Sequence, residues 1–156
     1  MYDGAYWDKV WSRPYGRYNR HHQAIWEAVL PFLKGKVLDL GCGPCVIYQG
    51  KDIDMLGVDI SHKALEEAAK NYPKGKYMQW DITVRLPIPD AVYDTVALFG
   101  VLDYYEDWDK ILKEARRVKK PDGHIVATLL NGYNGHDWTK YKHLTGNWYL
   151  YGEEIN

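Results

Sequence analysis

The sequence predicts an α/β domain in which helices cover both faces of a parallel sheet. Short apolar runs of strand length alternate with amphipathic helical stretches, the pattern of parallel-sheet proteins. The most informative run, residues 37–41, is too short for a helix and ends in a glycine turn at Gly41 and Gly43. Such a turn lets the backbone bend sharply and approach a ligand closely. The fold and the site are therefore both predicted from this stretch.

Composition limits the classes of protein to consider. At 156 residues the chain is expected to form one domain, 1–156, and its 46% hydrophobic and 26% charged content is typical of globular proteins. A net charge of −1 without a basic run disfavours a nucleic-acid partner. The first twenty residues lack a continuous apolar segment, so we expect no signal peptide, no membrane span and a cytoplasmic location.

The residues before the first strand, 1–35, contain an aromatic arm and a helix. The arm, 1–20, is rich in Trp, Tyr and Arg and shows no clean period, so packing against the core is its simplest interpretation. Asn19 is a suitable cap for a helix that ends at Gly35, and Pro31 is expected to bend or divide that helix.

The core, 36–131, is expected to contain five strands. After 37–41 comes a short helix near 44–49, and Ser61 and Asp107 are good caps for two amphipathic helices. Loop 83–93 and the turn at 121–123 separate later elements. The remaining strands are 55–58, 76–80, 95–99 and 125–130.

The tail, 132–156, is polar and aromatic and has few clear signals. Only the alternation at 148–151 indicates one more edge strand. We see no repeat, linker or low-complexity segment along the chain.

Three acids stand at or near the ends of neighbouring predicted strands. Asp39 lies inside a strand, whereas Asp59 and Asp81 directly follow strands. Taken singly, each has a structural explanation, as a turn cap or as a satisfied buried acid. Because ligands bind beyond the carboxyl ends of parallel strands, the three together with the glycine turn predict a binding site there.

These motifs resemble those of class I S-adenosylmethionine-dependent methyltransferases. The resemblance runs from about Tyr15 to Asn131, and it departs at Cys45, where the family often has a third glycine. It rests on 36–45, 58–61, 80–82, 86–90, 93–96, 99–102 and 118–123.

The resemblance implies a Rossmann-like sheet of order 3-2-1-4-5 and S-adenosylmethionine as cofactor, with S-adenosylhomocysteine as product. It places Asp39 near the methionine part, Asp59 on the ribose and Asp81 on the adenine amino group, with Ile82 packed on the ring. It also implies that the N-terminal arm acts as a lid over the cofactor. The expected cofactor contacts are Asp39, Gly41, Cys42, Gly43, Asp59, Ile60, Asp81, Ile82 and Phe99.

The methyl acceptor is expected to be a small molecule, because the charge is neutral and the chain ends are aromatic. Asp103 and His136 are the candidate bases, although a role as solvated loop residues is favoured for both. We expect no metal site, since two cysteines alone lack enough ligands nearby.

The family usually continues past the fifth strand with a helix and two strands, and 132–156 appears too short for them. We therefore expect these final two strands to be missing, and the tail or a second copy of the chain to cover the edge of the fifth strand. A non-catalytic or partner-dependent homologue that binds the cofactor is the corresponding alternative function.

Two further alternatives come from the same turn. Cys42-Gly43-Pro44-Cys45 matches the active-site letters of thioredoxins and predicts a thiol-disulfide oxidoreductase with a low thiol pKa at Cys42. A nicotinamide-binding oxidoreductase needs a third glycine where Val46 stands. Neither alternative explains all three acids.

Overall fold

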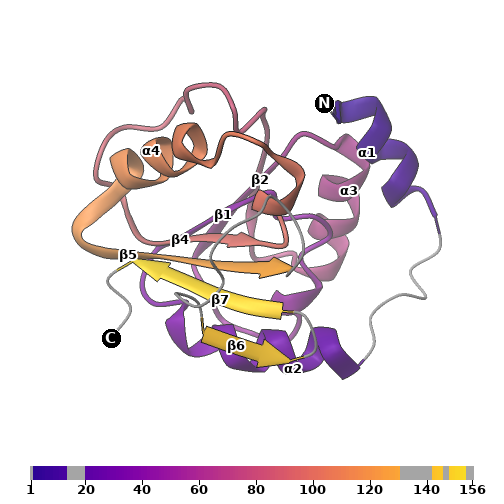
Figure 1. The fold of residues 1–156 in the computed structure, drawn as a ribbon. Coiled ribbons are helices and arrows are strands. Elements are labelled where there is room, and N and C mark those ends of the chain that lie inside the picture. Colours follow the sequence, from indigo (N-terminus) through magenta and orange to yellow (C-terminus); the bar gives the residue numbers. More distant parts are fainter. Residues whose placement is uncertain (1, 14–19, 131–141, 146–147, 154–156) are drawn as a thin grey trace.

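The computed structural model describes residues 2–13, 20–130, 142–145 and 148–153, which form a layered α/β structure (Figure 1). Its described strands make one seven-stranded sheet in the order β3-β2-β1-β4-β5-β7-β6. The strands are β1 (Val37–Leu40), β2 (Met55–Asp59), β3 (Lys76–Gln79), β4 (Tyr93–Phe99), β5 (Lys119–Leu130), β6 (Lys142–Thr145) and β7 (Trp148–Glu153).

The first five strands are parallel, and β1 lies at their centre. Asp39 of β1 stands beside Gly57 of β2 and Ala97 of β4. The carboxyl ends of these strands therefore meet at one edge of the sheet, and the predicted order 3-2-1-4-5 is confirmed. The fifth strand begins earlier than predicted, at Lys119, and its register with β4 shifts between Tyr93 and Thr95.

The prediction that the final two strands are missing is wrong. β7 pairs antiparallel with β5 and β6 pairs antiparallel with β7, so the tail extends the sheet by a hairpin. A hairpin needs few connecting residues, and only 146–147 separate the two strands. The tail thus covers β5, as expected, and a dimer through an exposed β5 edge loses its basis.

Four helices lie in the described part of the chain: α1 (Gly4–Trp11), α2 (Arg20–Val29), α3 (His62–Asn71) and α4 (Trp108–Val118). The predicted caps Ser61 and Asp107 are confirmed, since Ser61 Oγ accepts from the Ala64 amide and Asp107 Oδ1 from the Lys110 amide; the predicted cap Asn19 lies outside the described residues. Pro31 divides the second helix as expected, because α2 ends at Val29 and a 3₁₀ turn, η1 (Leu30–Phe32), follows. None of the described helices has the length and apolar character needed to cross a bilayer.

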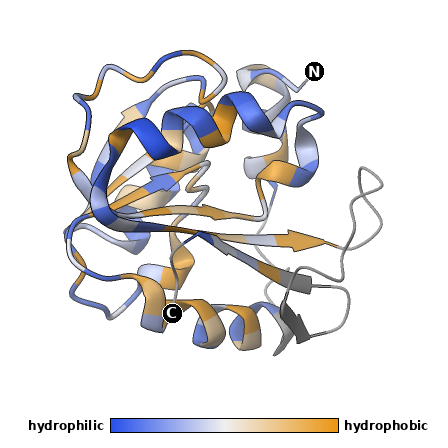
Figure 2. Cartoon of the chain, turned by 60° about the vertical axis from the view of Figure 1, so that its left-hand side comes forward, coloured by the Kyte–Doolittle hydropathy of each residue, from blue (hydrophilic) through white to orange (hydrophobic). Residues whose placement is uncertain are grey.

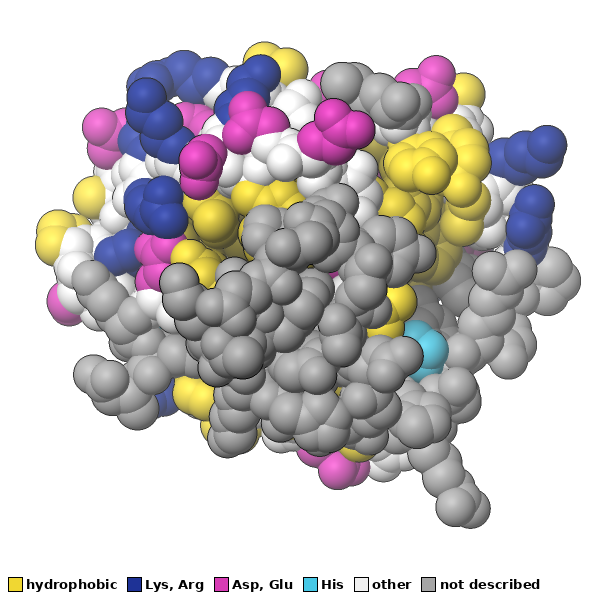
Figure 3. Space-filling model, in the orientation of Figure 1, with side chains coloured by type: hydrophobic (Ala, Val, Ile, Leu, Met, Phe, Trp, Pro, Cys, Tyr) yellow, Lys and Arg dark blue, Asp and Glu magenta, His cyan; other side chains and the backbone are white. Residues whose placement is uncertain are grey.

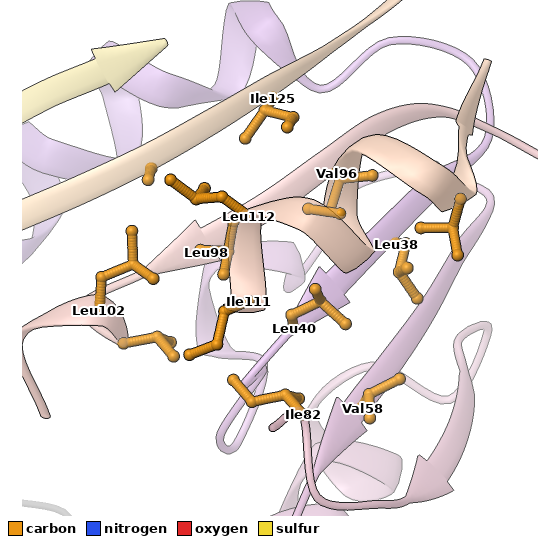
Figure 4. Packing of buried hydrophobic residues seen from close by; sticks show 14 of the residues in the cluster. Leu38, Leu40, Val58, Ile82, Val96, Leu98, Leu102, Ile111, Leu112 and Ile125 are labelled. Atoms are coloured by element: carbon orange, nitrogen blue, oxygen red, sulfur yellow. The ribbon is translucent and has the colours of Figure 1, made fainter. Parts of the chain in front are cut away.

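One face of the sheet packs against α4. The helix turns Ile111 and Leu112 toward the strands, where Leu40 and Leu98 lie close to them (Figure 4). All four side chains are buried, as the helical spacing of the apolar residues in α4 predicts.

The opposite face packs against α2 and α3, so the sheet lies between two helical layers (Figure 2). Because successive residues of a strand point to opposite faces, Val37 joins this second core while Leu38 joins the first. The same alternation turns the following acid, Asp39, away from α4 and toward the α2 and α3 layer.

We predict that Leu98→Ala lowers the free energy of unfolding by about 2–5 kcal/mol, because it opens a cavity at a fully buried position. Val84→Ala is the control: its side chain is 50% exposed, so a change within about 0.5 kcal/mol is expected. Urea denaturation measures both, and equal effects of the two substitutions would contradict the packing described.

Candidate functional site

A cavity of about 410 Å³ lies at the carboxyl ends of β1, β2 and β4, within the usual size range of small-molecule sites. Its walls come from the glycine turn, from the loops after β2, β3 and β4, and from α1 and α2. Among the residues predicted to contact a cofactor, those that line it are Asp39, Gly41, Cys42, Gly43, Asp59, Ile60, Ile82 and Phe99.

The glycine turn directly after β1 has the backbone that the sequence predicts. Gly41 has φ +72°, and a Cβ there would lie 2.6 Å from Val101 Cγ2. A side chain is thus excluded both by the left-handed conformation and by the close approach of the loop after β4. The Gly41 and Cys42 amides donate to the Val58 carbonyl at 2.7 and 3.0 Å, which ties the turn to β2.

The helix predicted near 44–49 is only a 3₁₀ turn, η2 (Val46–Tyr48). Cys45, just before it, has φ +56°, in the left-handed region that favours glycine. Cys45 is the position at which the sequence departs from the family pattern, which often has a third glycine. Its left-handed conformation is incompatible with an α-helix that begins at this residue. The short turn brings Tyr48 back over the end of β1.

Asp39 is the buried acid of the site. It is 2% exposed, and Tyr48 Oη donates to its Oδ2 at 2.7 Å. Burial raises the pKa of Asp39 to about 7, against the opposing effect of the Tyr48 hydrogen bond, and the nearby Asp59 charge adds to the rise. Its other oxygen, Oδ1, has no hydrogen-bond partner among the described residues.

Asp59 lies beside it and supports the loops around the cavity. Its Oδ2 accepts from the Gly43 amide and its Oδ1 from the Ser61 amide, both at 2.9 Å. Burial raises the pKa of Asp59, and these backbone hydrogen bonds partly oppose the shift. Since each carboxylate oxygen accepts two hydrogen bonds, Asp59 retains acceptor capacity for a ligand.

Two of the predicted residues that the structure describes are not brought to the cavity wall. Asp81 Oδ1 accepts from the Thr83 amide and hydroxyl at 2.9 and 2.7 Å, and Asp81 does not line the cavity. Asp103 is buried and accepts from the Leu130 amide at 3.0 Å, also away from the lining. His136 lies outside the described residues.

The N-terminal helix α1 forms one wall of the cavity through Trp7 and Trp11. Asp8, between them, attaches α1 to the start of α3: it accepts from Ser61 Oγ at 2.6 Å and from the Lys63 amide at 3.1 Å. These hydrogen bonds lower the pKa of Asp8. The described part of the aromatic arm therefore contributes to the cavity wall in addition to packing.

Several lining residues were not predicted from the sequence: Trp7, Trp11, Arg13, His22, Trp26, Trp80, Tyr104, Tyr105 and Thr128. The concentration of aromatic residues at the N-terminus was a signal for the first of them. Tyr104, from the 3₁₀ turn η3 (Leu102–Tyr104), carried none, because its ring meets Trp7 only after the chain has folded, with the ring centres 4.8 Å apart.

The two cysteines of the turn lack the properties of a redox pair. Both are free thiols, and Cys45 is buried. Burial is the largest cause that raises the pKa of the Cys42 thiol well above its ordinary value. A reactive dithiol requires the opposite shift, so the geometry disfavours the oxidoreductase alternative.

Comparison with known proteins gives a consistent picture. Residues 38–127 match the family model described as a methyltransferase domain. A crystal structure of an S-adenosylmethionine-dependent methyltransferase from Mesorhizobium loti superimposes with a TM-score of 0.60 at 25% identity, over 72% of this chain and 55% of that one.

Curated relatives have similar descriptions. A Mycobacterium tuberculosis protein described as "Probable S-adenosylmethionine-dependent methyltransferase" is 28% identical over 121 residues, which are 72% of this chain and 42% of the relative. A demethylmenaquinone methyltransferase from Bacillus velezensis is 32% identical over 102 residues, 59% of this chain and 44% of that protein. The chain thus spans less than half the length of these relatives.

We predict that Asp39→Asn changes the pH dependence of stability. Because the folded-state pKa of Asp39 is raised to about 7, its contribution to stability is complete below the unfolded pKa and is lost as pH rises through 7. From about pH 4 to 8 the wild type should lose roughly 4 kcal/mol relative to the variant. Urea denaturation across this range measures the difference, and parallel pH profiles would contradict the assignment.

We also predict that Asp8→Ala loosens α1. Loss of the contacts to Ser61 and Lys63 should raise amide exchange in residues 4–11 roughly fivefold, the effect of about 1 kcal/mol of hydrogen bonding. Lys9→Ala, at an exposed neighbouring position, controls for the change in helix composition. Hydrogen exchange followed by mass spectrometry reports both, and equal exchange in the two variants would argue against the attachment.

Proposed function

The chain belongs to the methyltransferase domain family, and from that premise we propose that it binds S-adenosylmethionine in this cavity and catalyses transfer of its methyl group to a small molecule. The observation that carries the proposal is the pair of buried carboxylates, Asp39 and Asp59, which line one cavity beside a glycine turn. The cofactor carries a sulfonium and an ammonium group, and carboxylates are suitable neighbours for such cations.

The residues present fit this cofactor. Asp39 Oδ1 is a buried acceptor without a partner in the described chain, so a cationic or hydrogen-bond-donating ligand group would satisfy it. We assign Asp39 and Gly41 to the methionine part and Asp59 to the ribose hydroxyls. Cys42, Gly43, Ile60 and Phe99 complete the cofactor wall.

The adenine end is assigned to Ile82, which lines the cavity and is 5% exposed, so that its side chain packs on the ring. Asp81 follows β3 at the same edge of the sheet, and we retain it for the adenine amino group. Asp81 does not line the cavity in this structure, so that contact requires a movement of the Asp81 side chain, whose Oδ1 is held by Thr83.

When bound, S-adenosylmethionine would supply a methyl group activated by its sulfonium, with a neutral thioether as the leaving group. The protein contributes position and surroundings. The glycine turn lets the backbone come close, and Trp7 and Trp11 restrict the access of water from the α1 side. Holding two reactants in line is worth roughly 7–11 kcal/mol in favourable cases.

We predict that Asp59→Asn weakens binding of S-adenosylhomocysteine by on the order of 1–3 kcal/mol, because the substitution removes the charge and replaces one of the two acceptor oxygens by a donor. Asp52→Asn is the matched control, since the Asp52 side chain is 93% exposed. Isothermal titration calorimetry measures both affinities. No detectable binding by the wild type, or equal binding by the wild type and Asp59→Asn, would contradict the proposed site.

A further inference from the structure

The cavity has two chemically different walls. The sheet side presents the carboxylates Asp39 and Asp59 and the glycine turn. The opposite side, from α1, α2 and η3, presents aromatic rings. The basic side chains among the described lining residues are Arg13 and His22. The proposed cofactor uses the first wall, which leaves the second wall to the methyl acceptor.

Aromatic rings dominate this second wall. The Trp7 and Tyr104 rings meet edge to face, with an interplanar angle of 87° and centres 4.8 Å apart. Tyr104 is 47% exposed, although it is part of this ring pair. Tyr2 and Tyr6 extend the cluster outward. The Tyr2 ring centre lies 5.9 Å from that of Tyr104, and the Tyr6 ring centre lies 5.2 Å from that of Trp7. Figure 3 shows hydrophobic side chains gathered over the α1 region, with Lys and Arg side chains beside them.

Rings arranged in this way favour a planar aromatic ligand. Stacked and edge-to-face contacts add about 0.5–1.5 kcal/mol per pair beyond the apolar area that they bury. An aliphatic ligand of similar size would bury the same apolar area but would make no ring–ring contacts. Trp7 of α1 and Tyr104 of η3 contact each other and both line the cavity, so a flat ring that packs on this pair contacts both elements.

Charge selects among aromatic ligands. Arg13 lines the cavity, and within the described chain it has no acidic partner. A guanidinium binds carboxylates and other oxyanions through several parallel hydrogen bonds. Beside Arg13 a cationic ligand group would be repelled, whereas an anionic one would be attracted.

We propose that the methyl acceptor is a small aromatic acid, whose ring packs against the Trp7–Tyr104 pair on the cavity side and whose anionic group meets Arg13. This inference rests on the proposed function, because it concerns the second wall of the same cavity. It names the chemistry of the acceptor, which the family match leaves open.

The test uses protein saturated with S-adenosylhomocysteine and three probes: 4-hydroxybenzoate, cyclohexanecarboxylate and benzylamine. These represent an aromatic acid, a non-aromatic acid and an aromatic cation. Calorimetry should show 4-hydroxybenzoate binding at least tenfold more tightly than either of the others. Preference for benzylamine, equal binding of the two acids, or no binding of any probe would overturn the proposal.

Variants then test the two contacts separately. Arg13→Gln should weaken 4-hydroxybenzoate about tenfold while leaving neutral phenol unchanged, whereas Trp7→Leu should weaken both. Lys9→Gln removes a charge at an exposed position of α1 and should change the affinity for neither 4-hydroxybenzoate nor phenol. Equal losses in Arg13→Gln and Lys9→Gln would show a general charge effect and overturn the assignment of Arg13.

The two levels of the proposal fail differently. If the wild type does not bind S-adenosylhomocysteine, the proposed function and this inference both fall. If S-adenosylhomocysteine binds but the aromatic acid shows no preference, only the acceptor class is wrong and the cofactor site stands. Circular dichroism of each variant excludes loss of folding as the cause of lost binding.

Discussion

The buried hydrogen bond from Tyr48 to Asp39 is the contact on which the site depends most. Burying a charged carboxylate is unfavourable, and the pKa of Asp39 is raised for that reason. A chain that keeps such a group in its central strand must support it with a donor, and Tyr48 supplies one. The 3₁₀ turn after Cys45 brings this tyrosine into place, so the departure from a regular helix is part of the same arrangement.

A second set of polar contacts joins the cofactor wall to the N-terminal helix. Ser61 caps α3 with its hydroxyl, donates that hydroxyl to Asp8 and donates its amide to Asp59. One residue thus contacts both the covering helix and a predicted ligand-binding acid. Ser61 therefore holds both the acid that is assigned to the ligand and the helix that forms the cavity wall. A change at Ser61 would affect both.

Local patterns predicted a large part of this protein. The five parallel strands, the caps Ser61 and Asp107, and a site at the carboxyl ends of the strands follow from periodicity, glycine placement and acids at strand ends. These signals are carried by a few adjacent residues. The strand order from β3 to β5 and the individual cofactor contacts were implied by the family resemblance. The tail was predicted only in part: the alternation at 148–151 indicated the strand that is β7, whereas β6 and the pairing of β7 with β5 were missed, because that pairing joins segments that no local pattern connects.

The sequence by itself determined which residues stand at the carboxyl edge of the sheet, since alternation of strands and helices leaves little freedom there. Only the tertiary structure decided what faces them. Trp7 and Tyr104 are nearly a hundred positions apart in the chain, and Arg13 belongs to an arm without a clean period. Contacts between such distant segments depend on how the helices pack across the sheet, and no local pattern of residues encodes that packing.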